Sequence, residues 1–356
     1  MTEIQMNDFE EIRTLEFINW QLFKHKTILI TGSTGLIGSN LVLALAYISR
    51  KQDLELQLIL PVRNVNKANK LFDDFSDSVS IIEYKLGDEL KCSKSIDYII
   101  HCASPTSSKD FSQAPVDVLT TNIMGTKALL EFARSKPVQK FIYLSSMEVY
   151  GFPKKGHKVV ETDAGAFNTM KERNSYPIAK IACESLCRSY YTQYSVPTVV
   201  LRLTQTFGPG VKYDDGRVFA QFMRCAIEKK DIVLKTKGET ERSYLYTADA
   251  VTAIITAMLK GQSGEAYSVA NPATYCSIKE MAEIVASEIA NGEINVVFDL
   301  NDDLAKLGYA NTLHMDLDVS KINLLGWNAK TDLKQMFLRA IKNLEYEYEK
   351  NRHVES

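Results

Sequence analysis

Two short stretches of this chain carry side chains that together could oxidise an alcohol. The first is the stretch 145–151, which includes Ser146 and Glu148, and the second runs from Tyr176 to Lys180. A tyrosine has an unperturbed pKa of about 10, so its surroundings must supply roughly 4 kcal/mol before it acts as a base near neutral pH. On a helix, Tyr176 and Lys180 lie on one face, where the ammonium favours the phenolate. Ser146 is predicted to hydrogen-bond the reacting oxygen.

A glycine-rich turn lies near the start of the chain, where a predicted strand, Thr27 to Thr31, is followed by an apolar helix. This order is the setting that a dinucleotide-binding turn requires. The first glycine permits the tight turn, the second lets the backbone approach a pyrophosphate, and the third lets helix pack on strand. The cofactor-binding residues predicted here are Gly32, Thr34, Gly35, Leu36, Ile37 and Gly38.

The end of the second predicted strand bears on the choice between NAD and NADP. An NAD-binding protein usually presents an acid there to the adenosine ribose, whereas this chain has Arg63, whose charge suits a 2′-phosphate. We therefore expect NAD or NADP as cofactor, with NADP favoured; a solvated surface arginine is the alternative interpretation. Asp88, after the third strand, is predicted either to contact the adenine edge or to be an ordinary turn residue.

Short β-rich runs alternate with helix-length segments over most of the chain. This alternation predicts an α/β fold, a Rossmann-like doubly wound parallel sheet, with a smaller C-terminal substrate-binding lobe. The expected strands are Thr27 to Thr31, Leu56 to Val62, Ser80 to Tyr84, Tyr98 to His101, Phe141 to Ser145 and Thr198 to Leu203.

The same pattern predicts the domain division. Residues 1–25 are expected to form an N-terminal helical extension laid on the outside of the sheet. Residues 26–206 form the NAD(P)-binding Rossmann domain, to which residues 243–272 return, and the segments 207–242 and 273–350 form the substrate-binding lobe. The residues with helical spacing in the first segment are Ile12, Leu15, Ile18 and Leu22.

Composition excludes several classes of protein. Hydrophobic residues make up 45% of the chain and charged residues 24%, as in globular proteins, and apolar stretches such as Val251 to Leu259 are too short to span a bilayer. A formal net charge of −2 gives no case for nucleic-acid binding. The acidic N-terminus lacks the features of a secretion signal, so we expect a cytoplasmic protein with reduced cysteines. No histidine completes a metal site at Cys183 and Cys187, which are expected to pack on a helix.

From Lys26 to Met336 the chain resembles the extended short-chain dehydrogenases/reductases, a family of nucleotide-sugar epimerases, dehydratases and decarboxylases. The motifs that carry the resemblance, besides the glycine turn, are His101-Cys-Ala-Ser104, Asn122 with Gly125-Thr126, Ser146, Tyr176, Lys180, Arg202 with Phe207-Gly-Pro209, and Arg242-Ser-Tyr-Leu-Tyr246 followed by Asp249. The resemblance implies a nucleotide-sugar substrate and a homodimer, formed where the helices of residues 122–133 and 176–191 meet their symmetry mates.

The resemblance also implies roles for single residues. The implied catalytic residues are Ser146, Tyr176, Lys180 and Glu148. Ala103 and Asn122 join the implied cofactor-binding residues, as do Tyr176 and Lys180, and Asn122 also shapes the active site. The implied substrate-binding residues are Ser104, Thr206, Arg217 and Arg242. Arg242 is expected to hold the nucleotide diphosphate; for Arg217 a surface arginine is the alternative interpretation.

Within this family the chain looks closest to UDP-glucuronate decarboxylases, which oxidise C4 of the sugar so that the C6 carboxylate is lost from a β-keto acid. The shared motifs are Ala103-Ser-Pro-Thr-Ser107, Pro115, Thr121-Asn122, Glu148-Val-Tyr-Gly151, Thr206-Phe-Gly-Pro209 and Asp215-Gly-Arg-Val218. The chain departs from them at Arg63, at Met147, and at Pro177-Ile178 inside the Tyr-Lys motif.

The residue between Ser146 and Glu148 narrows the reaction further. A 4,6-dehydratase needs an acid there to protonate the departing C6 hydroxyl, and a thioether such as Met147 cannot donate a proton. Glu148 is left as a base at C5, a group that polarises a water, or a residue that holds the neighbouring loop. Three hypotheses follow: an epimerase or decarboxylase with internal redox chemistry, an NADPH-dependent reductase of a nucleotide-activated keto sugar, and a non-catalytic nucleotide-binding regulatory protein.

Overall fold

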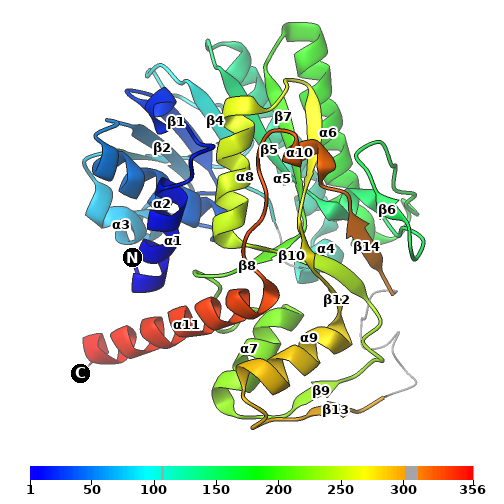
Figure 1. Ribbon diagram of the computed structural model, residues 1–356. Helices are drawn as coiled ribbons and strands as arrows, with labels where there is room; N and C mark the ends of the chain where they lie inside the picture. The colour runs from blue at the N-terminus through cyan, green and yellow to red at the C-terminus, as the bar shows by residue number, and fades with distance from the viewer. Residues whose placement is uncertain (106–107, 301–311, 356) are drawn as a thin grey trace.

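A seven-stranded sheet forms the centre of the molecule (Figure 1). The computed structural model describes residues 1–105, 108–300 and 312–355. All neighbouring strands of the sheet are parallel, in the order β11-β7-β5-β4-β1-β2-β3. The strands are β1 (Thr27–Thr31), β2 (Gln57–Val62), β3 (Val79–Glu83), β4 (Tyr98–His101), β5 (Lys140–Ser146), β7 (Thr198–Leu203) and β11 (Glu265–Val269). The six strands expected from sequence are therefore confirmed, each to within one residue.

The strand order reverses at β1, which pairs with β2 on one side and with β4 on the other. In the register of these pairs Thr31 lies beside His101, and on the next strands Ser146 lies beside Leu203. The carboxyl ends of the central strands thus meet along one edge of the sheet. Ligands of doubly wound sheets bind outside that edge, next to the reversal.

Helices cover both faces of the sheet (Figure 1). α5 and α6 pack against each other on one face, and α2 and α8 cover the other. Side chains alternate between the two layers, so that Leu201 of β7 joins the core under α8 and Val200 joins the core under α6. The helices around the sheet are α2 (Leu36–Gln52), α3 (Val65–Phe72), α4 (Ser108–Gln113), α5 (Pro115–Arg134), α6 (Ser175–Tyr194), α8 (Thr247–Lys260) and α10 (Ser320–Asn323), with the short 3-10 helices η2 (Asp73–Phe75), η3 (Met147–Tyr150) and η4 (Glu172–Asn174).

A second, smaller unit is built on β10 (Figure 1). Its five-stranded sheet has the order β12-β10-β14-β6, with β8 also paired to β10, and β9 pairs with β13. Phe207, Phe219, Tyr244 and Phe337 belong to a hydrophobic core of its own. Residues 301–311 of the expected substrate lobe lie outside the described residues. The elements are β6 (Lys158–Val159), β8 (Gln205–Phe207), α7 (Val218–Glu228), β9 (Ile232–Leu234), β10 (Glu241–Tyr246), β12 (Asn271–Ser277), α9 (Ile278–Ile284), the π-helix η5 (Val285–Ile289), β13 (Val296–Phe298), β14 (His314–Leu317) and α11 (Leu333–Glu355).

The N-terminal helix is shorter than its apolar spacing suggests. α1 (Glu3–Arg13) begins at a capping box on Thr2 and ends at Arg13, and the 3-10 helix η1 (Trp20–Phe23) follows. Ile12 and Ile18 are buried, whereas Leu22 is 52% exposed. α1 packs on α2, α8 and α11, outside the sheet. No helix in the described part of the chain is long and apolar enough to cross a membrane.

A buried carboxylate, Asp8, joins this N-terminal helix to the rest of the molecule. Its oxygens accept hydrogen bonds from Tyr246 Oη and from Arg339, each at 2.7 Å. Burial raises the pKa of Asp8 to about 6, although both hydrogen bonds act in the opposite direction. The charged form is therefore less favourable in the folded than in the unfolded chain.

We predict a matching pH dependence of stability. Between about pH 4 and pH 6 the folded state binds the proton of Asp8 more tightly than the unfolded state, so this residue lowers the free energy of unfolding as pH rises. Across this pH range the free energy of unfolding of the wild-type protein, measured with urea, should fall by up to about 3 kcal/mol relative to that of Asp8→Asn. Glu16→Gln removes an exposed acid near the same helix, and its free energy of unfolding should depend on pH as that of the wild type does. An unchanged difference between wild type and Asp8→Asn at all pH values would contradict the prediction.

Candidate active site

The glycine turn after β1 is tightly enclosed by backbone. Gly32 has φ of +68°, and a Cβ there would lie 2.6 Å from the backbone nitrogen of Ala103, at the end of β4. A Cβ on Gly38 would lie 2.2 Å from the carbonyl oxygen of Gly32. Gly35 donates its backbone N–H to the same carbonyl at 3.0 Å. Only glycine fits at the first and third positions, which brings the start of α2 against the ends of β1 and β4.

The first turn of α2 is open to an anion. Gly35 is its N-cap and offers no side chain, so the N–H groups of the first turn have no side-chain partner. Ser33 Oγ, next to them, is buried without a hydrogen-bond partner. The expected residues Thr34, Leu36 and Ile37 line this part of the chain. Free N–H groups at a positive helix end fit the pyrophosphate of a dinucleotide.

Three cations on the segments that follow β2 and β8 have no acidic partner among the described residues. Arg63 is exposed directly after β2, and Lys67 of α3 donates its ammonium to the carbonyl oxygen of Thr34 at 2.9 Å. Burial and the nearby charge of Lys212 lower the pKa of Lys67. Within the described residues, none of the three has a carboxylate within 4.0 Å of its charged group. Lys67 and Lys212 were not anticipated from sequence, because their proximity depends on how α3 and the loop after β8 fold back.

Asp88 lies in an exposed turn after β3. Its backbone carbonyl accepts a hydrogen bond from Tyr84 Oη at 3.2 Å, and the turn packs near α5, where a Cβ on Gly87 would be 3.9 Å from Met124. Its carboxylate has no hydrogen-bond partner among the described residues. The contact with adenine therefore stays a prediction.

Ser146, Tyr176 and Lys180 come together where β5 ends and α6 begins. Ser146 is the last residue of β5, and the side chain of Tyr176, which is 7% exposed, lies close enough for Ser146 to lower the pKa of its phenol. Lys180 is buried and donates its ammonium to the carbonyl oxygen of Leu144 at 2.7 Å. Its Nζ lies 5.7 Å from the centroid of the Tyr176 ring and 4.8 Å from that of Tyr143. The spacing on the helix thus places the ammonium on the ring side, without a direct hydrogen bond to the phenol.

Burial is the largest influence on the pKa values of Tyr176 and Lys180. It raises the pKa of Tyr176, as does the charge of Glu148, while the hydrogen bond from Ser146 and the charge of Arg173 act in the opposite direction. Burial also lowers the pKa of Lys180 to about 8. The phenol is therefore protonated at neutral pH, and a further positive charge beside it is needed before it can act as a base.

Met147 and Glu148 point to different surroundings. Met147 is 5% exposed, and its sulfur accepts a hydrogen bond from Thr204 Oγ1 at 3.2 Å in the core. Glu148, which is partly exposed, forms an ion pair with Arg173 at 3.2 Å. The residue after Ser146 thus supplies no proton donor, and the carboxylate that follows it is tied to the loop before α6. Both a loop-holding role and a chemical role of Glu148 are compatible with this position.

Two residues that the sequence analysis did not single out lie against the tyrosine. Phe111 of α4 stacks on the Tyr176 ring at a centroid distance of 4.3 Å and an interplanar angle of 10°. The guanidinium carbon of Arg173 lies 4.8 Å from the Phe111 centroid. Arg173 stands three residues before Tyr176, a spacing that could have directed attention to it. Phe111 is brought in by tertiary packing alone.

Asn122 and Ser104 form one hydrogen-bonded pair in the wall of the site. Asn122 of α5 is buried, donates to the carbonyl oxygen of Val118 at 2.7 Å and accepts from Ser104 Oγ at 2.8 Å. Ala103, which lies between β4 and Ser104, has its backbone in close contact with Gly32. The structure thus places Ala103, Ser104 and Asn122 beside the glycine turn.

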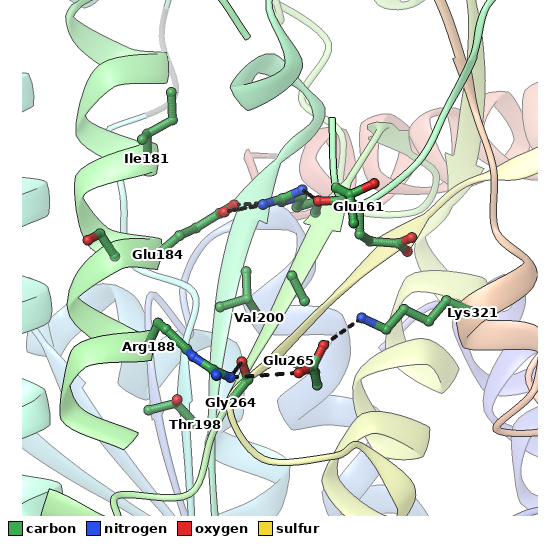
Figure 2. A pocket seen from close by; sticks show the side chains of 13 residues that line it. Glu161, Ile181, Glu184, Arg188, Thr198, Val200, Gly264, Glu265 and Lys321 are labelled. Atoms are coloured by element: carbon green, nitrogen blue, oxygen red, sulfur yellow. Dashed lines mark hydrogen bonds and ion pairs between the residues drawn. The ribbon is translucent and has the colours of Figure 1, made fainter. Parts of the chain in front are cut away.

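A buried polar network lies behind Ser146. Ser145 Oγ donates to Glu184 of α6 at 2.5 Å, and Glu184 forms an ion pair with Arg202 of β7 at 2.7 Å. Figure 2 shows Glu184 reaching from α6 across a cavity of about 420 Å³ at the β7–β11 edge of the sheet. Ser146, Tyr176 and Lys180 do not line this cavity. The ion pair fixes β5, α6 and β7 to one another just beneath the candidate site.

The residues expected to bind substrate in the smaller unit differ in their surroundings. Arg242 of β10 has a buried Nε without a hydrogen-bond partner. Thr206 is buried on β8 and donates to the carbonyl oxygen of Thr204 at 3.0 Å. Arg217, at the N-cap of α7, already forms an ion pair with Asp215 at 2.6 Å. An orphaned guanidinium nitrogen fits a ligand anion, whereas Arg217 would have to share its charge.

Cys183 and Cys187 are buried on the sheet side of α6, and Cys183 accepts a hydrogen bond from Thr126 Oγ1 at 3.3 Å. They belong to the core between α5, α6 and the sheet. Within the residues that the structure describes, no three metal-ligating side chains gather at one place.

Fold and site together are those of a dinucleotide-dependent enzyme of the Rossmann class. The family model described as the NAD dependent epimerase/dehydratase family matches residues 28–270. Because that match spans more than half of the chain, the protein belongs to this family, as the resemblance in its motifs implied.

Characterised relatives span several reactions. UDP-glucuronic acid decarboxylase 1 of Arabidopsis thaliana is 28% identical over 90% of this chain and 70% of its own length. dTDP-D-glucose 4,6-dehydratase of Bos taurus is 28% identical over 89% of this chain and 88% of its own. Relatives at this level of identity therefore include both a decarboxylase and a dehydratase of nucleotide sugars.

Solved structures share the fold. UDP-N-acetylglucosamine 4-epimerase from Methanobrevibacter ruminantium, in complex with UDP-N-acetylmuramic acid, superposes with a TM-score of 0.77 at 21% identity, over 91% of this chain and 99% of that one. The dTDP-glucose 4,6-dehydratase of Bacillus anthracis, with NAD, gives 0.72 at 21% identity, covering 91% and 98%. RMD from Pseudomonas aeruginosa, with NADPH, gives 0.69 at 20% identity, covering 90% and 99%. The fold therefore occurs with either cofactor.

We predict that the third glycine of the turn is indispensable. Gly38→Ala would push a methyl group into the Gly32 carbonyl, so it should lower the free energy of unfolding by about 1 to 3 kcal/mol and weaken binding of both NAD and NADP. Urea unfolding and cofactor titration measure the two effects. Gly216→Ala is the control, because a Cβ there meets nothing within 4 Å. Equal losses of stability and cofactor affinity in the two variants would contradict this explanation.

Proposed function

We propose that the protein converts a nucleotide sugar by transient oxidation of a sugar hydroxyl, C4 in our assignment, as an epimerase or decarboxylase. The observation that carries the proposal is the group of Ser146 with the buried Tyr176 and Lys180 at the carboxyl end of β5, beside a glycine turn that fits a dinucleotide. Membership of the family and the reactions of its relatives support it.

Each residue of the group has a proposed task. Tyr176 takes the proton of the sugar hydroxyl, and Ser146 hydrogen-bonds the same oxygen and orients it. Lys180 supplies positive charge on the ring side of the tyrosine. When bound, the nicotinamide supplies the hydride acceptor and the positive charge that the buried phenol lacks. Gly32, Thr34, Gly35, Leu36, Ile37, Gly38, Arg63, Asp88, Ala103 and Asn122 are the proposed cofactor contacts.

The choice between reactions depends on what lies next to Ser146. The buried thioether of Met147 argues against a dehydratase because no acid is available there. Epimerisation needs only room for the keto sugar to turn over, whereas decarboxylation proceeds once C4 is a ketone. Glu148 is close enough to Tyr176 for its charge to raise the pKa of the phenol.

We propose that the segments 207–242 and 273–350 form the substrate lobe and that residues 243–272 return to the cofactor domain. Arg242 binds the diphosphate, which its unpartnered Nε supports. Ser104, Thr206 and Arg217 complete the substrate contacts. The protein is proposed to act in the cytoplasm as a homodimer through α5 and α6, a surface where Met124 and Ile181 are 53% and 37% exposed.

The test is a panel of nucleotide sugars read by mass spectrometry. Loss of carbon dioxide identifies a decarboxylase, and an unchanged mass with a changed sugar identifies an epimerase. Tyr176→Phe should lower kcat by at least about a hundredfold, because the general base is removed. Phe152→Leu, an exposed change on the loop after η3, is the control. Loss of water from the substrate, or an unchanged kcat of Tyr176→Phe, would refute the proposal. Unchanged biological activity of Tyr176→Phe, with no sugar of the panel converted, would favour the regulatory protein.

A second candidate is an NADPH-dependent reductase of a nucleotide-activated keto sugar. The unpaired cations Arg63, Lys67 and Lys212 favour it, since together they suit a 2′-phosphate and a consumed reductant is more often NADPH. The two candidates differ in turnover. The reductase consumes reduced nicotinamide in equal amount to product, whereas the enzyme with internal redox chemistry converts substrate without net loss of cofactor.

We predict that the same cations set cofactor preference. Arg63→Ala and Lys67→Ala should each weaken NADP binding by about tenfold while changing NAD binding little, because only NADP carries the 2′-phosphate. Calorimetric titration with both cofactors measures the ratio. Lys70→Ala, which removes an exposed charge from the same helix, should leave the ratio unchanged. Equal effects on NAD and NADP would show that these side chains do not select between the cofactors.

A further inference from the structure

An ion pair stands beside the proposed reacting tyrosine. Arg173, on the short helix η4 before α6, donates from one guanidinium nitrogen to Glu148 Oε2 at 3.2 Å. The same guanidinium lies over Phe111, which is stacked on Tyr176. One aromatic side chain, Phe111, therefore lies between the guanidinium and the phenol ring. Neither the family match nor the relatives assign it a task.

The charge of Glu148 is a problem for the proposed chemistry. A carboxylate near Tyr176 opposes formation of the phenolate, which is the form that accepts the substrate proton. A lone carboxylate at this place would act together with burial against the base. Glu148 nevertheless occupies the position directly after the buried Met147, where η3 turns its side chain toward the loop that carries Arg173.

We propose that Arg173 is a positioning residue that holds Glu148 beside the sugar and cancels the effect of its charge on Tyr176. This inference rests on the proposed function and deepens it. It explains how the site keeps a carboxylate near C4 and C5 without losing its base. The positive charge of the guanidinium offsets the rise in the pKa of Tyr176 that the charge of Glu148 causes.

The other groups around Tyr176 do not perform this task. Lys180 of α6 lies on the ring side and donates to Leu144, and Tyr143 of β5 is uncharged because burial raises its pKa. The described side chain that α4 places against the tyrosine is Phe111. Arg173 is thus the cation that faces Glu148 among the described residues around the phenol.

A merely structural role predicts a different result. The side chains of Arg173 and Glu148 are 41% and 31% exposed, so their ion pair should add little to the stability of the fold. Replacement of Arg173 should leave urea unfolding nearly unchanged. The effect should appear in the protonation of Tyr176 instead.

The experiment is a titration of Tyr176 followed by NMR of protein with carbon-labelled tyrosine, with oxidised cofactor present and the signal assigned through Tyr176→Phe. In Arg173→Gln the midpoint should rise by about one pH unit, a tenfold smaller phenolate fraction near neutral pH. Glu148→Gln should lower it, and the double variant should return close to wild type. Arg173→Lys should restore most of the wild-type midpoint, and Lys171→Gln, an exposed charge in the same loop, should not move it.

The outcome does not depend on which sugar is converted, so it separates this proposal from the proposed function. An unchanged midpoint in Arg173→Gln overturns the role of Arg173 even if the enzyme converts a nucleotide sugar through Tyr176. A wild-type Tyr176 that does not titrate below about pH 10 with cofactor present also overturns it. A raised midpoint with normal unfolding supports it even if the sugar panel identifies another reaction.

Discussion

The site depends on one close approach of backbone to backbone at the carboxyl end of the sheet. Gly32 meets Ala103, and Gly38 meets the Gly32 carbonyl, at distances that exclude any side chain. This contact brings β1, β4 and the start of α2 together, and so creates a helix end open to phosphate. β5 lies next to β4, which is why Ser146 at its end faces the same space. The glycines therefore determine where the reactive group stands relative to the dinucleotide.

The second constraint is burial, which disfavours the charged forms of the residues it encloses. Tyr176 and Lys180 are both enclosed, and enclosure favours the neutral form of each. The groups that lower the pKa of Tyr176 against burial come from separate elements, Ser146 on β5 and Arg173 on η4. Glu184 and Arg202 hold β5, α6 and β7 in fixed relation, so these small distances are set by the sheet and its helices.

Sequence predicted the parts of this arrangement that repeat locally. The six strands, the glycine turn and the Tyr-Lys spacing each have a period or a motif, and the structure has the strands within one residue. The contacts of Phe111, Lys67 and Lys212 have no such signal, because they arise when segments distant in the chain fold together. The N-terminal helix shows the opposite error: the apolar spacing continues to Leu22, but the helix ends at Arg13 and Leu22 is exposed.

Met147 acquires a different meaning once its surroundings are known. From sequence it is a missing acid; in the structure its side chain belongs to the core and accepts a hydrogen bond from Thr204, directly before β8. β8 pairs with β10, which carries Arg242, so the strand end with Ser146 is packed against the base of the smaller unit. An acid at position 147 would bury a charge in that contact, which is costly without a partner. The same packing that removes a proton donor thus joins the two units.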